Sequence, residues 1–205
     1  KTLSHYRYLL FIFNSVNIFL IIYHAATETR IIIVDTTLLG IVSNTPLQSK
    51  NFPVLYCAFF SVPLSLTIIH YLYRYWAIRT PHKLSLFTSI KFQLLLVLFT
   101  LIEAVSWYLL GYLGTDGGPH EIGTTIVREA YRLKFNITIW DGWMVMDNWR
   151  NGQFSAKLTT TIACGCVLMV TNFLLTFTLS NVTFLHIKRA SQLSVKLRKT
   201  HFTIF

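Results

Sequence analysis

Four long apolar runs, separated by polar segments, dominate the pattern of this chain. They cover residues 8–26, 52–76, 92–113 and about 162–187. Each run is long enough to cross a bilayer as a helix, which takes about 20 predominantly apolar residues. The pattern therefore predicts an all-α fold, a polytopic transmembrane helix bundle with four spanning helices in a single domain over residues 1–205. A fifth apolar run, 31–42, is too short to span and contains Asp35, so we expect it in an external loop.

Composition and charge give this bundle an orientation. Of the residues, 53% are hydrophobic and 13% are charged, whereas soluble domains carry about 25% charged residues. Eleven Lys and Arg residues and no acids occupy the two ends of the chain and the segment 74–91, which starts at the end of the second run. The alternate segments hold seven basic and seven acidic residues. Because Lys and Arg near helix ends stay cytoplasmic, both chain ends are predicted inside. A nucleic-acid partner is not expected, since such a protein would not alternate its charge by loop.

The long external loop, 114–158, is rich in aromatic residues, among them Trp140 and Trp143. Loops of this length are functional or disordered, and the aromatic content argues against disorder. Two interpretations stay open: a folded lid over the outer helix ends, or a belt of aromatic side chains at the membrane interface. The loop also contains the sequon Asn136-Ile137-Thr138, which predicts a glycosylated Asn136.

Glu103 is the one acidic residue within a spanning run. A carboxylate at that depth costs a few kcal/mol and must face other helices or water. It could contact a ligand or act as a polar switch, with Trp107 one turn further along the same face. It could instead form a structural hydrogen bond to another helix, to a residue such as Asn14, Asn17 or Asn172.

The remaining residues with chemical potential do not form a catalytic set. The chain has no HExxH, no GxSxG and no phosphate-binding glycine loop, so an enzyme is not expected, and no cofactor or metal is implied. Cys57, Cys164 and Cys166 lie within apolar runs and are expected to be packing residues.

The second run ends in an aromatic and basic segment, 70–83, which contains Arg74, Tyr75, Arg79 and Lys83. On physical grounds alone this is an interfacial aromatic belt with arginines reaching toward the headgroups. However, Tyr73-Arg74-Tyr75-Trp76-Ala77 also resembles the segment that ends helix 3 in nematode serpentine chemoreceptors of the Str type. The segment 4–10, Ser-His-Tyr-Arg-Tyr-Leu-Leu, resembles the start of helix 2 in that family.

The resemblance implies helices 2 to 5 of a rhodopsin-like seven-helix receptor, a G-protein-coupled chemoreceptor for odorant or taste molecules. A partial sequence is expected, with a plasma-membrane location in sensory cilia. The implied partners are a small-molecule odorant, a heterotrimeric G protein and membrane lipids. The implied G-protein contacts are Arg74, Tyr75, Arg79 and Lys83, and the candidate ligand pocket comprises Cys57, Glu103, Trp107, Trp140 and Trp143.

The chain departs from the rhodopsin-like pattern in two places. Tyr73 occupies the position of the acidic residue that restrains the arginine. The external loop has no cysteine to pair with Cys57, so we expect packing alone to hold the lid. The alternative to a receptor is a four-helix membrane scaffold or transporter subunit, which would need no arginine switch.

Overall fold

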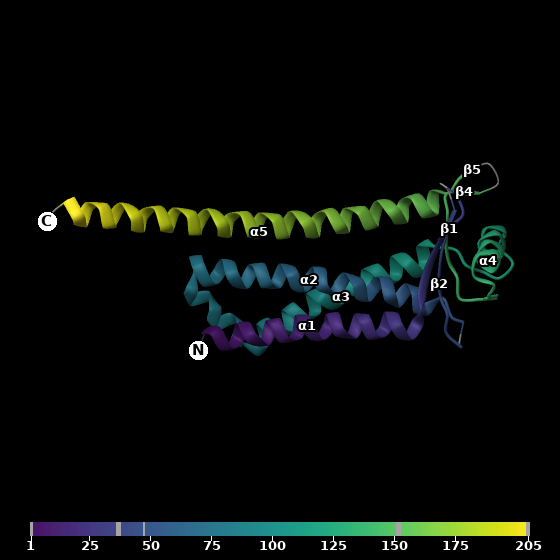
Figure 1. Cartoon of the computed structure of the whole chain (residues 1–205), viewed down its shortest axis with the longest axis horizontal. Coiled ribbons are helices and arrows are strands. Elements are labelled where there is room, and N and C mark those ends of the chain that lie inside the picture. Colours follow the sequence, from purple (N-terminus) through teal and green to yellow (C-terminus); the bar gives the residue numbers. More distant parts are fainter. Residues whose placement is uncertain (1, 36–37, 47, 151–152, 204–205) are drawn as a thin grey trace.

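Four long helices form the body of the computed structural model (Figure 1). The structure describes residues 2–35, 38–46, 48–150 and 153–203, with side chains over 7–35, 38–46, 48–149 and 153–189. The helices are α1 (Thr2–Thr27), α2 (Asn51–Arg79), α3 (Ile90–Gly114) and α5 (Ala156–Thr203). Within the described residues, four helices are long and apolar enough to cross a membrane, and they coincide with the four predicted runs.

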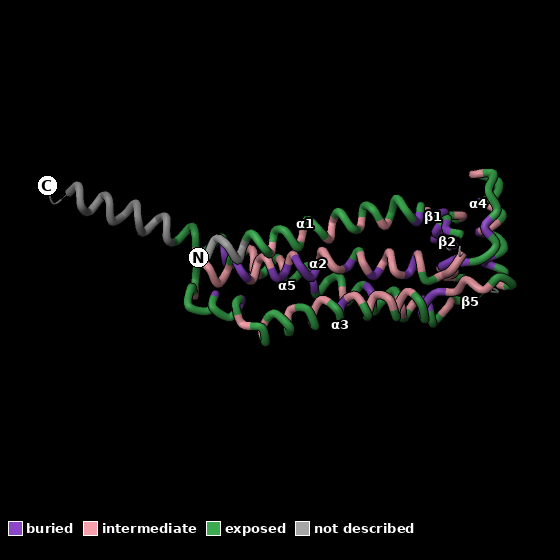
Figure 2. The backbone as a smooth tube through the Cα atoms, turned by 90° about the horizontal axis from the view of Figure 1, so that it is seen from below, coloured by how far each residue is buried: buried purple, intermediate pink, exposed green. Residues whose placement is uncertain are grey.

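Helix α2 is the central helix, because it packs against α1, α3 and α5. It also has the most buried positions, which Figure 2 shows as purple and pink segments along its length. The other three helices expose large apolar side chains along most of their length, among them Phe11, Leu94 and Phe173. Apolar surface all round a helix is typical of a membrane span, where lipid takes the place of water.

A small sheet lies across the outer ends of the helices. Strands β1 (Thr29–Ile33) and β2 (Leu38–Ser43) form an antiparallel hairpin, and β3 (Met144–Asp147) pairs antiparallel with β2. Since β3 belongs to the loop between α3 and α5, the sheet joins the two outer loops. The described residues of 31–42 form strands, so the prediction that this run is not a spanning helix is confirmed.

Helix α4 (Ile122–Phe135) packs on this sheet, and together they form a folded cap. A short hairpin, β4 (Trp149–Arg150) and β5 (Gln153–Phe154), leads into α5. The long loop is thus a folded lid. Its core consists of buried side chains from both outer loops: Ile32, Leu38, Val42, Val127, Tyr131, Ile139, Trp143 and Val145.

Contacts with the helix ends fix the cap in place. The Lys50 ammonium donates to the carbonyl oxygens of Tyr112 (2.9 Å) and Thr115 (2.7 Å), at the end of α3. Lys157, at the start of α5, forms an ion pair with Asp116 (3.1 Å). The expectation that packing alone holds the lid therefore needs correction, because strand hydrogen bonds and charged contacts also hold it.

The inner ends of α2 and α3 are joined by η1 (Pro81–Thr88), a 3-10 helix. Phe87, only 6% exposed, lies at the centre of an aromatic cluster. Its ring centroid is 5.0 Å from that of Tyr73, 5.6 Å from that of Trp76 and 5.2 Å from that of Phe92. These distances are typical of edge-to-face packing, and they anchor the inner loop between the two helices.

The two termini lie at the end of the bundle opposite the cap (Figure 1). This arrangement matches the alternation of charge along the sequence, with the seven loop acids on the cap side. The side chains of Lys196, Arg198 and Lys199, which belong to the predicted basic tail, lie outside the described residues.

Candidate functional site

A groove lies between α2 and α5 near the inner ends of the bundle. Its volume is about 580 Å³. The α2 wall includes Arg74, which is exposed and holds its guanidinium carbon 5.9 Å from the centroid of the Tyr71 ring. The α5 wall, which the sequence did not single out, consists of Ser180, Thr183, Phe184 and Ile187. The groove is therefore an apolar slot with a permanent cation in its wall.

The other predicted G-protein contacts lie at the same depth but not in the groove. The Arg79 guanidinium donates to the Tyr75 hydroxyl (2.5 Å) and lies over the same ring at 5.7 Å. The Lys83 ammonium is 5.9 Å from the centroid of the Trp76 ring. Aromatic rings attract such cations through their negative faces. These contacts keep the Arg79 and Lys83 charges on the surface beside the groove. Of the four predicted G-protein contacts, only Arg74 lines the groove.

Tyr73, next to Arg74 in the sequence, belongs to the aromatic cluster of the inner loop. Its side chain is 5% exposed and packs edge-to-face on Phe87. Tyr73, which the resemblance places where rhodopsin-like receptors carry an acid, thus anchors the inner loop. Phe87 was not recognised from the sequence, although an aromatic residue in a short polar-flanked loop was the available signal.

Glu103 and Trp107 do lie together, between α3 and α5. Glu103 is 8% exposed, and its Oε1 atom accepts hydrogen bonds from Trp107 Nε1 (3.0 Å) and from Asn172 Nδ2 (2.6 Å). Of the three asparagines considered as partners, Asn172 is the one that bonds to this carboxyl group. Both contacts are within the range of good hydrogen bonds.

The other residues of the candidate ligand pocket lie elsewhere. Trp143 is fully buried in the cap core, where its Nε1 donates to the carbonyl oxygen of Ile139 (2.9 Å). Trp140 is 63% exposed, with Arg128 over its ring at 5.1 Å. Cys57 packs against the buried cluster of Ile41, Val54 and Met144, where the cap meets α2. Cys57, Trp140 and Trp143 therefore do not share one cavity with Glu103 and Trp107.

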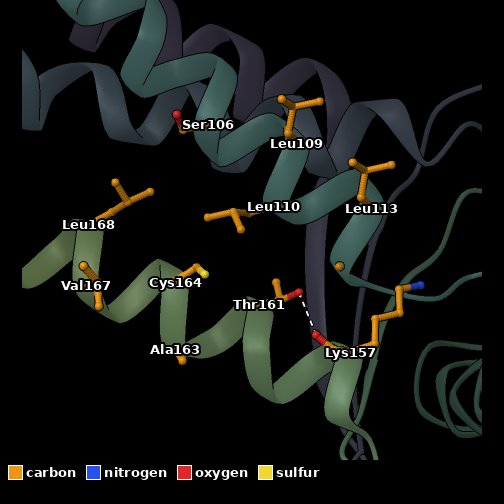
Figure 3. Close-up of a pocket in the computed structure, with 11 residues that line it drawn as sticks. Ser106, Leu109, Leu110, Leu113, Lys157, Thr161, Ala163, Cys164, Val167 and Leu168 are labelled. Atoms are coloured by element: carbon orange, nitrogen blue, oxygen red, sulfur yellow. Dashed lines mark hydrogen bonds between the residues drawn. The ribbon is translucent and has the colours of Figure 1, made fainter.

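A second hollow, of about 690 Å³, lies between α3 and the first turns of α5 (Figure 3). Its lining is mainly aliphatic, and Leu110 and Leu168 point into it from the two helices. Leu109 and Leu113 on its α3 side are 47% and 63% exposed. The hollow is thus open to the outside of the bundle, and the two helices separate there.

Comparisons with known proteins place these observations in a family. A search of curated proteins found no match, and a search of solved structures found none either. The family model for the serpentine type 7TM GPCR chemoreceptor Str matches residues 1–205, which is the whole chain. Together with the four spanning helices, this match makes the chain a multi-pass membrane protein. The chain belongs to the Str family of serpentine seven-transmembrane chemoreceptors.

Proposed function

We propose that this chain detects small odorant or taste molecules at the plasma membrane of sensory cilia and couples them to a heterotrimeric G protein. The observation that carries the coupling role is the position of Arg74. It lines an apolar groove between the central helix and α5, at the basic end of the bundle. Small molecules would arrive from the cap side and shift an existing equilibrium between bundle states.

The groove suits a helical segment of a G protein. An amphipathic helix can place its apolar face against Phe184 and Ile187. Its carbonyl or carboxylate oxygens can then accept from the Arg74 guanidinium, because arginine stays charged and offers a planar set of donors. Around the groove, Arg79, Lys83 and Lys91 are exposed, and such residues attract anionic lipid headgroups by about 1 kcal/mol each.

Nucleotide exchange on purified heterotrimeric G proteins tests this proposal. The receptor is placed in lipid nanodiscs and exposed to a panel of small volatile molecules. Arg74→Ala is expected to lower the stimulated exchange rate at least about tenfold, which corresponds to about 1.4 kcal/mol. Lys91→Ala is the matched control, because it removes an exposed inner cation that does not line the groove. Equal effects of the two substitutions, or no effect of either, would refute the role of Arg74.

A further inference from the structure

Glu103, Trp107 and Asn172 form a polar cluster between α3 and α5 that lies outside the inner groove. Glu103 and Asn172 are 8% and 5% exposed, and both hydrogen bonds converge on one carboxyl oxygen. We infer that this cluster, here called the polar lock, fixes the position of α5 against α3 and thereby sets the geometry of the inner groove. Glu103 is then a positioning residue.

The surroundings of the polar lock explain why hydrogen bonds decide the position there. Lipid tails are as apolar as leucine, so membrane helices associate through close packing and interhelical hydrogen bonds. Close packing between α3 and α5 depends on Gly114, where a Cβ atom would collide with Thr161. A Cβ atom on Gly165 would lie 3.6 Å from the Trp107 ring, an ordinary contact distance. Beside these contacts the helices separate around the 690 Å³ hollow, which offers no further packing.

Helix α5 connects the polar lock to the inner groove. Asn172 and Thr183 are eleven residues apart, or about three helical turns and 16 Å, so they lie on the same face. Thr183 lines the groove, and α5 contains no proline to interrupt the helix between the two positions. A shift of α5 at Asn172 is therefore carried to the groove wall. The consequence for G-protein coupling rests on the proposed function, whereas the geometric link does not.

Side-chain chemistry separates the variants that keep the polar lock from those that break it. Glutamine at position 103 retains an acceptor oxygen of the same reach, so Glu103→Gln is expected to keep both bonds. Glu103→Leu removes the acceptor. Asn172→Leu removes the interhelical donor and adds bulk at this position, whereas Asn172→Ala removes the donor without adding bulk. Thr171→Leu is the matched control, since Thr171 is exposed and its hydroxyl bonds only within α5, to the Val167 carbonyl oxygen.

Electron–electron distance measurements on spin labels test the inference in the full chain in lipid nanodiscs. The three native cysteines are replaced by alanine, and labels are attached at Ile78 and Phe184. Both positions are exposed and line opposite walls of the groove. Glu103→Gln and Thr171→Leu should leave the distance distribution unchanged. Glu103→Leu and the two Asn172 variants should shift the mean by more than about 3 Å, twice the helical rise per residue, or broaden the distribution correspondingly.

An unchanged distribution in a monodisperse Asn172→Leu or Asn172→Ala protein would overturn the inference. So would a Glu103→Gln shift as large as that of Glu103→Leu, because glutamine keeps the acceptor oxygen that leucine lacks. G-protein exchange on the same variants separates the two proposals. Altered distances with unaltered exchange support the polar lock and contradict the coupling role of the groove, and the converse result contradicts the polar lock alone.

Discussion

Trp143→Ala should unfold much of the cap, and this is the sharpest test of how the outer end is built. Trp143 is fully buried among side chains from both outer loops. Its ring lies 5.4 Å from Tyr131 of α4 at an interplanar angle of 80°, and its indole N–H bonds to Ile139. Truncation therefore removes the side chain that joins α4 to the sheet.

The expected magnitude follows from these contacts. Replacing a fully buried Trp with Ala typically costs 3–5 kcal/mol, and the lost hydrogen bond adds about 1 kcal/mol. Whole domains are stable by only about 5–15 kcal/mol, so the cap should lose most of its stability. Trp140→Ala is the matched control, three residues earlier in the same loop. Its ring is 63% exposed, and an exposed cation–π contact such as that with Arg128 is worth about 0.5–1 kcal/mol.

Hydrogen–deuterium exchange with mass spectrometry measures the difference peptide by peptide. Amides of β2, β3 and α4 should lose protection by more than about a hundredfold in Trp143→Ala, which corresponds to about 2.7 kcal/mol. They should change by less than about fivefold in Trp140→Ala. If Trp143 were instead a ligand contact, its truncation would leave these amides protected without ligand. Protection of the cap in Trp143→Ala within a few-fold of the parent would refute the packing argument.

Three further substitutions, two of them paired with a control substitution, have defined outcomes. Asn136→Gln should remove a glycosidase-sensitive mass shift in cells, because Asn136 is exposed on the cap. Asn181-Val182-Thr183 is a second sequon, but Asn181→Gln should not alter migration, because Asn181 lies within the spanning helix α5. Lys50→Met should cost about 1–3 kcal/mol in thermal unfolding, because two carbonyl groups at the end of α3 lose their donor. Burial lowers the pKa of Lys50, so the unfolded chain binds this proton more tightly. The free energy of unfolding should therefore rise as pH increases from the lowered Lys50 pKa to the ordinary lysine pKa. Lys50→Met should abolish that rise. Phe87→Ala should cost about 3–5 kcal/mol and release the amides of η1 in hydrogen exchange, whereas Leu86→Ala, 41% exposed, should not.

The sequence predicted the spanning helices well because hydropathy reports the contact with lipid directly. The predicted run 52–76 and the helix Asn51–Arg79 differ by at most three residues at either end. Helix α5 begins six residues before its apolar run. Its first turns contain Lys157 and three threonines, which hydropathy does not recognise as helix. Ser155 is the missed signal, because its hydroxyl accepts from the Leu158 amide as an N-terminal capping residue does.

The pairing of β2 with β3 in the cap was beyond sequence reasoning, because it joins residues more than 100 positions apart. Leu39 lies opposite Met146, and neither segment alone indicates the other. The same distance explains why Trp140 and Trp143 could not be told apart, since only the fold decides which ring enters the core. Helix α4 was accessible, however. Val127 and Tyr131 are one turn apart, and with Thr124 they form its buried face.

The contacts that position α2, α3 and α5 change in kind with depth, and the surrounding solvent explains the change. At the outer end, backbone groups would otherwise bond to water, so strand pairing and the exposed Lys157–Asp116 pair supply orientation more than energy. In the middle, where lipid surrounds the helices, α3 and α5 pack on the buried face of α2, and the hydrogen bond from Asn172 to the Glu103 carboxyl group adds a direct link between α3 and α5. At the inner interface, where aromatic rings are favoured, Phe87 joins the helices. Cys57 packs where β3 pairs with β2, so strand pairing and side-chain packing together join α2 to the loop between α3 and α5.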